Sequence, residues 1–70
     1  MSETIKVVVN GQERKIDRSS TGLDLLRVLE LDPRTVVVEL NKEIVRRTAL
    51  SETRLRDGDR IEIVHFVGGG

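Results

Sequence analysis

IKVVVNG, the stretch at residues 5–11, decides the fold of this chain. Its β-branched side chains favour an extended strand. On the two-residue period of a strand, one face carries Ile5, Val7 and Val9. The pair Asn10-Gly11 is the strongest short-range signal for a type I′ hairpin, because both central residues of that turn need positive φ. Residues 12–17 should therefore return as the partner strand.

A helix is expected next, because the stretch TGLD at residues 21–24 has the form of a capping box. In that motif the Thr21 hydroxyl and the Asp24 carboxylate satisfy backbone groups that the first turn of a helix leaves open. The apolar stripe that follows at helical spacing comprises Leu25, Leu26, Val28 and Leu29. Pro33 should close the helical segment. We expect the helix to pack on the strands through that stripe.

The second half of the chain reads as further strands separated by turns. In order, we expect a strand at residues 36–40, a turn at 41–43, an edge strand at 44–45, one helical turn at 48–52 capped by Thr48, a turn at 57–59 and a last strand at 60–67. Alternation within the third strand places Val36, Val38 and Leu40 inward.

A hairpin, one helix and then more strands predict an α+β fold. The helix would cross one face of a mixed sheet of four to five strands, which is the ubiquitin-like β-grasp arrangement, with the first and last strands side by side in the middle. That strand order follows from knowledge of the fold family, because periodicity gives elements but not their neighbours. A competing α+β sandwich stays open. Residues 1–67 should form one domain and residues 68–70 a flexible glycine tail.

Composition restricts the possible functions. The chain has 70 residues, which leaves no room for a catalytic cleft beside a core. It has no cysteine, which excludes disulfides and thiolate chemistry and points to a reducing compartment. Twelve basic and twelve acidic residues cancel, so a general nucleic-acid role loses weight. No basic leader or membrane-length apolar run is present, and we expect a cytoplasmic protein that is a monomer alone.

The last residues, Gly68, Gly69 and Gly70, offer a free main-chain carboxylate on a thin stalk. Glycine has no Cβ, so a partner's active site could reach Gly70 through a narrow tunnel without meeting a side chain. The alternative is a frayed end or a cloning scar. We interpret the Gly70 carboxylate as the reactive group, with Gly68 and Gly69 providing access.

The strand before the tail displays a candidate docking patch. If Ile61 and Ile63 are core, Val64 and Phe66 lie on the opposite face, beside Val8 or Val37. Large exposed aromatic residues are enriched at binding hot spots, and Phe66 is the one aromatic residue of the chain. Docking candidates are therefore Val64, Phe66 and Val67. A one-residue slip of register would instead send Phe66 inward.

Other polar residues favour structural readings. His65 has no neighbouring Cys, Ser or second His in the sequence, so catalysis is a minor alternative. The basic pairs Arg46-Arg47 and Arg54/Arg56 fit a solvated face better than a partner's acidic groove. Asp57 and Asp59 flank a turn glycine, where carboxylates accept local backbone hydrogen bonds. No bound metal or cofactor is expected.

Four stretches, taken together, resemble the ThiS-type sulfur carriers of thiamine biosynthesis. They are VVVNG at residues 7–11, TGLDLL at 21–26, VELNKEIV at 38–45 and DGDRIEIV at 57–64. The chain departs from the pattern at residues 46–50, where relatives often show proline and tryptophan, and in ending with three glycines.

The resemblance implies a cycle in which the chain is a protein cosubstrate and not an enzyme. A ubiquitin-activating-type adenylyltransferase would use ATP to adenylate Gly70, a persulfide protein would supply sulfur, and the resulting thiocarboxylate would serve thiazole synthase. ATP would be held by the partner, because this chain has no glycine-rich phosphate loop between a strand and a helix. A molybdopterin-type carrier, a ubiquitin-like modifier and a plain interaction domain remain as alternatives.

Overall fold

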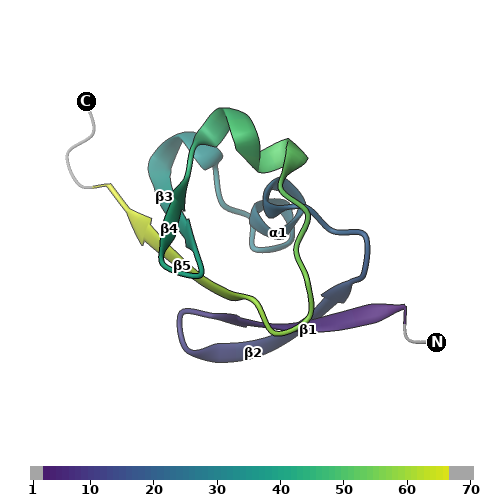
Figure 1. Cartoon of the computed structure of the whole chain (residues 1–70). Helices are drawn as coiled ribbons and strands as arrows, with labels where there is room; N and C mark the ends of the chain where they lie inside the picture. Colours follow the sequence, from purple (N-terminus) through teal and green to yellow (C-terminus); the bar gives the residue numbers. More distant parts are fainter. Residues whose placement is uncertain (1–2, 67–70) are drawn as a thin grey trace.

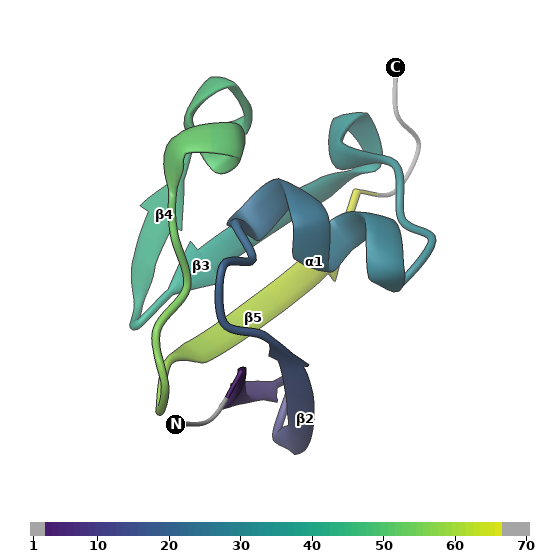
Figure 2. The same ribbon diagram turned by 90° about the vertical axis from the view of Figure 1, so that its right-hand side faces the viewer.

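The structure is a computed structural model that describes residues 3–66. Within that range five strands form one mixed sheet in the order β2-β1-β5-β3-β4 (Figure 1). Figure 2 shows the α-helix lying across one face of the sheet. In chain order the elements are β1 Thr4–Val9, β2 Gln12–Asp17, α1 Gly22–Val28, the 3-10 helix η1 Pro33–Thr35, β3 Val36–Leu40, β4 Glu43–Val45, the 3-10 helix η2 Arg47–Glu52 and β5 Arg60–His65.

The topology confirms the predicted β-grasp arrangement. β1 and β5 are neighbours in the middle of the sheet and run parallel, with Val8 opposite Arg60 and Val9 opposite Ile61. β5 also pairs with β3 in antiparallel fashion. The last described strand is therefore hydrogen-bonded on both sides. The predicted boundary between residues 67 and 68 lies outside the described residues and stays a prediction.

The first hairpin forms as its sequence predicts. Asn10 and Gly11 both have positive φ, at 49° and 84°. The Asn10 side chain then reaches the central strand: its Oδ1 accepts from the Ile63 N–H at 2.8 Å and its Nδ2 donates to the Ile63 carbonyl at 3.3 Å. Asn10 therefore ties the hairpin turn to β5 as well as making the turn.

The helix begins as predicted and ends earlier than predicted. The capping box is present, with the Asp24 N–H donating to the Thr21 hydroxyl and the Thr21 N–H donating to the Asp24 carboxylate. The helix ends at Val28, where a positive φ at Glu30 breaks it, so Pro33 starts η1 and does not close the helix.

Val28 was predicted to be core, and that prediction is wrong, since its side chain is 66 % exposed. Helical residues advance by about 100° each, so Val28 lies about 110° from the centre of the packed stripe. The stripe is made by Gly22, Leu25, Leu26 and Leu29.

Two details of the second hairpin differ from expectation. Asn41 and Lys42 both have positive φ, at 51° and 73°, and make a two-residue turn, so Glu43 belongs to β4 and not to the turn. The following 3-10 helix starts at Arg47 with Arg46 as its N-cap and no side-chain cap, so Thr48 does not cap it. The difference in the turn comes from non-glycine residues with positive φ, which amino-acid type alone does not predict.

The core lies between the sheet on one side and the two helices α1 and η2 on the other. It is entirely aliphatic and comprises Ile5, Val7, Val9, Ile16, Leu25, Leu26, Val36, Val38, Leu50, Leu55, Ile61 and Ile63. α1 and η2 approach closely at Gly22, where a Cβ would stand 3.0 Å from Leu50 Cδ2. Leu40, predicted inward, is half-buried against this cluster.

Candidate functional site

The candidate site is the end of β5 from which the chain continues toward its glycines. β5 ends at His65, so Phe66 does not continue the strand as predicted. The Phe66 N–H still donates to the Thr35 carbonyl at 3.0 Å, which fixes the chain beside β3. The predicted site residues Val67, Gly68, Gly69 and Gly70 lie outside the described residues, and their roles stay predictions.

Alternation along β5 separates a packed face from an open face. Ile61 and Ile63 are buried, whereas Val64 is 59 % and Phe66 is 56 % exposed. Val64 lies opposite Val37 on β3, and Val8 lies opposite Arg60. Val37 and not Val8 is therefore the neighbour of Val64. The pairing with β3 ends at His65, and the exposed aromatic residue Phe66 follows directly, next in sequence to the predicted tail.

The open face continues from this apolar pair toward β4. One row back along the sheet, Glu62 of β5 lies opposite Glu39 of β3, and Glu39 lies opposite Ile44 of β4. Ile44 is 68 % exposed. We define the open patch as Val37, Glu39, Ile44, Glu62, Val64 and Phe66, of which Val37 and Glu39 are half-buried and the other four exposed. Strand periodicity predicts that the members from β3 and from the last strand point outward, but only the pairing of β3 with β5 brings the two glutamates together.

Within the described residues, His65 belongs to no cluster of possible metal ligands. It is exposed and lies opposite Val36. Among residues 3–66, no group of three or more His, Cys, Asp or Glu side chains could hold a metal ion. Arg46 and Arg47, the first basic pair, are exposed.

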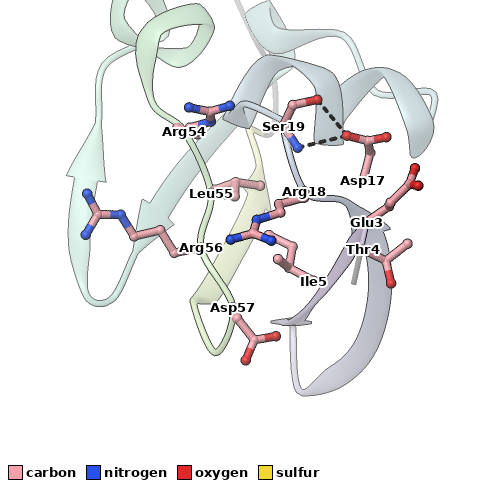
Figure 3. Close-up of a pocket in the computed structure, with 10 residues that line it drawn as sticks. All are labelled: Glu3, Thr4, Ile5, Asp17, Arg18, Ser19, Arg54, Leu55, Arg56 and Asp57. Carbon is pink, nitrogen blue, oxygen red and sulfur yellow. Dashed lines mark hydrogen bonds between the residues drawn. The ribbon is translucent and has the colours of Figure 1, made fainter. Parts of the chain in front are cut away.

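A groove of about 860 Å³ opens at the other end of the sheet (Figure 3). Figure 3 shows the Arg18 side chain lying between Ile5 and residues 54–57. Three arginines line the groove together with Glu3, Asp17 and Asp57, so charges of the two signs balance there. The second predicted basic pair, Arg54 and Arg56, belongs to this groove and lies far from the open patch.

Aspartates around this end of the molecule accept hydrogen bonds from backbone N–H groups; the predicted local bond within the turn is made by Asp59, whereas the bond of Asp57 is to a distant strand. Asp57 accepts from the Lys6 N–H at 2.9 Å, and Asp59 accepts from the Arg56 N–H at 2.8 Å. At the end of β2, the hydroxyl and the N–H of Ser19 donate to Asp17 and lower the pKa of that carboxyl. Asp57 therefore ties the turn to β1, whereas Asp17 and Asp59 hold backbone groups within three residues of themselves.

Asp32 and Arg34 form an ion pair on η1, next to the start of β3. The Arg34 guanidinium donates to the Asp32 carboxylate at 2.8 Å and the Arg34 N–H donates at 2.9 Å. These bonds lower the pKa of Asp32 to about 2.

None of the helices within residues 3–66 is long and apolar enough to cross a membrane.

Comparison with known proteins relates most of the chain to one family. The model of the ThiS family matches residues 7–70. The sulfur carrier protein ThiS of Bacillus subtilis is 46 % identical over 63 residues, which cover 89 % of this chain and 96 % of that protein. A crystal structure of the thiamine biosynthesis protein ThiS from Geobacter metallireducens superposes with a TM-score of 0.81 at 36 % identity and covers 94 % of this chain and 100 % of that one.

Some relatives are much longer. The thiazole synthase of Paramagnetospirillum magneticum is 46 % identical over 66 residues, and that of Magnetococcus marinus is 38 % identical over 66 residues. The match covers 94 % of this chain and 20 % of each synthase. A module similar to this chain therefore occurs within polypeptides that are named for thiazole synthesis.

Proposed function

We propose that this chain, which belongs to the ThiS family and is a sulfur carrier protein of thiamine biosynthesis, carries its sulfur on the main-chain carboxylate of Gly70. Proteins of this family are carriers and not catalysts, so the chain is acted on by enzymes. The observation that carries the proposal is the family match, which extends through residue 70. Two exposed apolar residues, Val64 and Phe66, also lie within a few residues of Gly70 in the sequence.

The chemistry needs activation because a carboxylate is a poor electrophile. Its negative charge repels nucleophiles, and oxide is a poor leaving group. Attack of the Gly70 carboxylate on the α-phosphorus of ATP expels pyrophosphate and leaves an acyl adenylate. A persulfide then attacks the carbonyl carbon and expels AMP, and a thiol that cleaves the resulting acyl disulfide releases the thiocarboxylate.

Three partners follow from this sequence of steps. An adenylyltransferase of the ubiquitin-activating type holds ATP, so the carrier binds no cofactor itself. A protein persulfide supplies the sulfur. Thiazole synthase receives it, an assignment supported by the synthases that contain a module similar to this chain. Because activation consumes ATP, we place the cycle in the cytoplasm.

Docking is assigned to the residues that lead into the tail. Val64 and Phe66 are exposed apolar side chains within a few residues of Gly70, and Val67 follows them in the sequence. An enzyme that takes up the tail must cover this end of β5. Covering large apolar side chains contributes favourable free energy to binding, roughly in proportion to the area removed from water.

Intact-mass spectrometry tests the proposal. The full chain is incubated with the adenylyltransferase, ATP and a persulfide source, and we expect a mass gain of one sulfur-for-oxygen exchange. Deletion of Gly70 should abolish the gain, and Gly69→Ala should reduce it strongly because a methyl group obstructs a narrow tunnel.

Thermal unfolding of each variant is the control. Both variants should unfold at the temperature of the parent chain, since neither change touches the described core. Sulfur uptake by the Gly70 deletion, or sulfur located by fragmentation at another residue, would contradict the proposal. An isopeptide to lysine as the only product would indicate a protein modifier instead.

A further inference from the structure

Two glutamates face each other on the open face of the sheet. β3 pairs with β5 so that Glu39 lies directly opposite Glu62, and such pairs have Cβ atoms about 5 Å apart. Within residues 3–66, neither carboxylate takes part in an ion pair or a side-chain hydrogen bond. Arg60 shares the face two residues before Glu62 and forms no ion pair with it in this part of the chain. Like charges opposite each other destabilise a sheet, so the fold gains nothing from this pair.

The two carboxylates have apolar neighbours on two sides, toward the tail and toward β4, and Arg60 on a third. The next row toward the tail is the pair Val37 and Val64, and Ile44 lies across from Glu39 on the other side. A partner that covers the exposed apolar side chains also removes the two carboxylates from water. An unpaired buried charge is strongly unfavourable, whereas a charge-assisted hydrogen bond from a cation offsets the loss of hydration. The open patch therefore fits a surface that brings a cation to a position between the two glutamates.

The length of the chain beyond Phe66 decides which partner this is. Four residues, 67–70, follow Phe66, and they span at most about 14 Å when fully extended. An enzyme that acts on the Gly70 carboxylate must hold its active site within that distance of Phe66. Glu62 lies on β5, only four residues before Phe66 in the sequence, so that enzyme is in reach of both glutamates.

We propose that Glu39 and Glu62 together receive one lysine or arginine side chain of the enzyme that adenylates Gly70. This inference rests on the function proposed above and adds the charge and position of a contact by which the enzyme selects the carrier. A planar guanidinium can donate to two carboxylates at once, which favours arginine. The repulsion between the glutamates in the unbound carrier is then relieved in the complex.

A second like-charge pair on the same sheet supplies a matched control. Lys6 of β1 lies opposite Lys15 of β2, also on the open face, but at the edge of the sheet away from the tail. If opposed like charges mattered only for stability, relief of either pair would have the same consequence. Our proposal predicts that the glutamate pair alone affects the enzyme.

The test measures steady-state adenylation of the full chain by the ubiquitin-activating-type adenylyltransferase of the same organism. For the double variant Glu39→Gln/Glu62→Gln we expect the KM for the carrier to rise about tenfold with kcat unchanged, because the loss falls on binding. The salt dependence of KM should also become weaker. Glu39→Lys/Glu62→Lys should raise KM by about a hundredfold or more, and Lys15→Gln should leave it unchanged.

Outcomes separate this inference from the proposed function. A glutamine double variant that keeps the KM of the parent chain while Gly70 is adenylated overturns the inference and leaves the function standing. If the parent chain is not adenylated at Gly70, the proposed function fails, and calorimetric titration of enzyme with carrier decides the inference on its own. Weaker binding of the glutamine variant then supports the contact, and equal or absent binding refutes it. Thermal unfolding shows that each variant is folded, and a purely structural role would change that temperature without changing KM.

Discussion

The two faces of β5 obey different constraints although they are made by alternating residues of one strand. On the packed face, Ile61 is 1 % exposed and lies under α1. On the open face, Glu62 and Val64 lie in solvent within the described part of the chain, and the one contact between charged residues across the strands is repulsive. Packing therefore explains Ile61 and Ile63 on the first face, though not the exposed His65 at its end, and it explains few residues of the second face. The residues that the fold does not explain are those available to a partner.

Truncating one side chain on each face is the strongest test of this difference between the two faces. Ile61→Ala should lower the free energy of unfolding by about 2–5 kcal/mol, because it opens a cavity in a closed core. That is comparable to the whole stability of a domain of this size, so the variant should be largely unfolded at physiological temperature.

Val64→Ala is the matched change on the open face. It should alter the free energy of unfolding by less than about 1 kcal/mol and raise the KM for adenylation instead. Urea denaturation followed by far-ultraviolet circular dichroism measures the first quantity, since the chain has no tryptophan or tyrosine to report by fluorescence. Similar losses for the two variants would show that the open face belongs to the core.

A smaller effect is expected from adding a methyl group instead of removing one. At Gly22 a Cβ would stand 3.0 Å from Leu50 Cδ2, and Leu50 is itself buried. Gly22→Ala should therefore destabilise by about 1 kcal/mol despite the better helix propensity of alanine. Val64→Ile adds a methylene on the open face and should be neutral. A stabilised Gly22→Ala variant would mean that α1 and η2 can separate without loss.

The smallest expected effect concerns the exposed ion pair of Asp32 and Arg34. The pKa of Asp32 is lowered to about 2, so the pair stabilises the fold above the unfolded-state pKa of about 4. That contribution is lost as the pH falls from about 4 through about 2. Urea midpoints at pH values across this window should differ between the parent chain and Asp32→Asn at the upper end and converge at the lower end. If the two urea midpoints differed by the same amount at every pH, ionisation of Asp32 would not be the cause of the difference.

Much of the fold could be predicted from local sequence signals, because each signal has a local physical cause. Asn10-Gly11 and the capping box of Thr21 with Asp24 satisfy backbone groups within a few residues, and both are present in the structure. Errors arose where the cause lies elsewhere. Glu30 ends the helix through a positive φ that its residue type does not signal, and the end of β5 depends on its pairing with β3.

The candidate site shows the same division. Strand alternation was enough to predict that Val64 and Phe66 are exposed, once Ile61 and Ile63 are assigned to the core. It could not predict that Glu39 faces Glu62, because the register between strands more than twenty residues apart in the sequence is set by the whole sheet. The roles proposed for the terminal glycines are supported by the reactivity of a main-chain carboxylate and by the family match, which extends to residue 70.

The position of β5 has a consequence for the synthesis of the carrier on the ribosome. β5 lies in the middle of the sheet, yet it is the last of the described strands to be translated. Until it emerges, β1 and β3 have no common neighbour, so the sheet is split into two hairpins that are too small to be stable by themselves. Nascent chains that stop early therefore cannot assemble the surface that a partner recognises. A correctly assembled surface thus reports that translation has passed the central strand, and unfinished copies are left to the proteases that remove unfolded polypeptides.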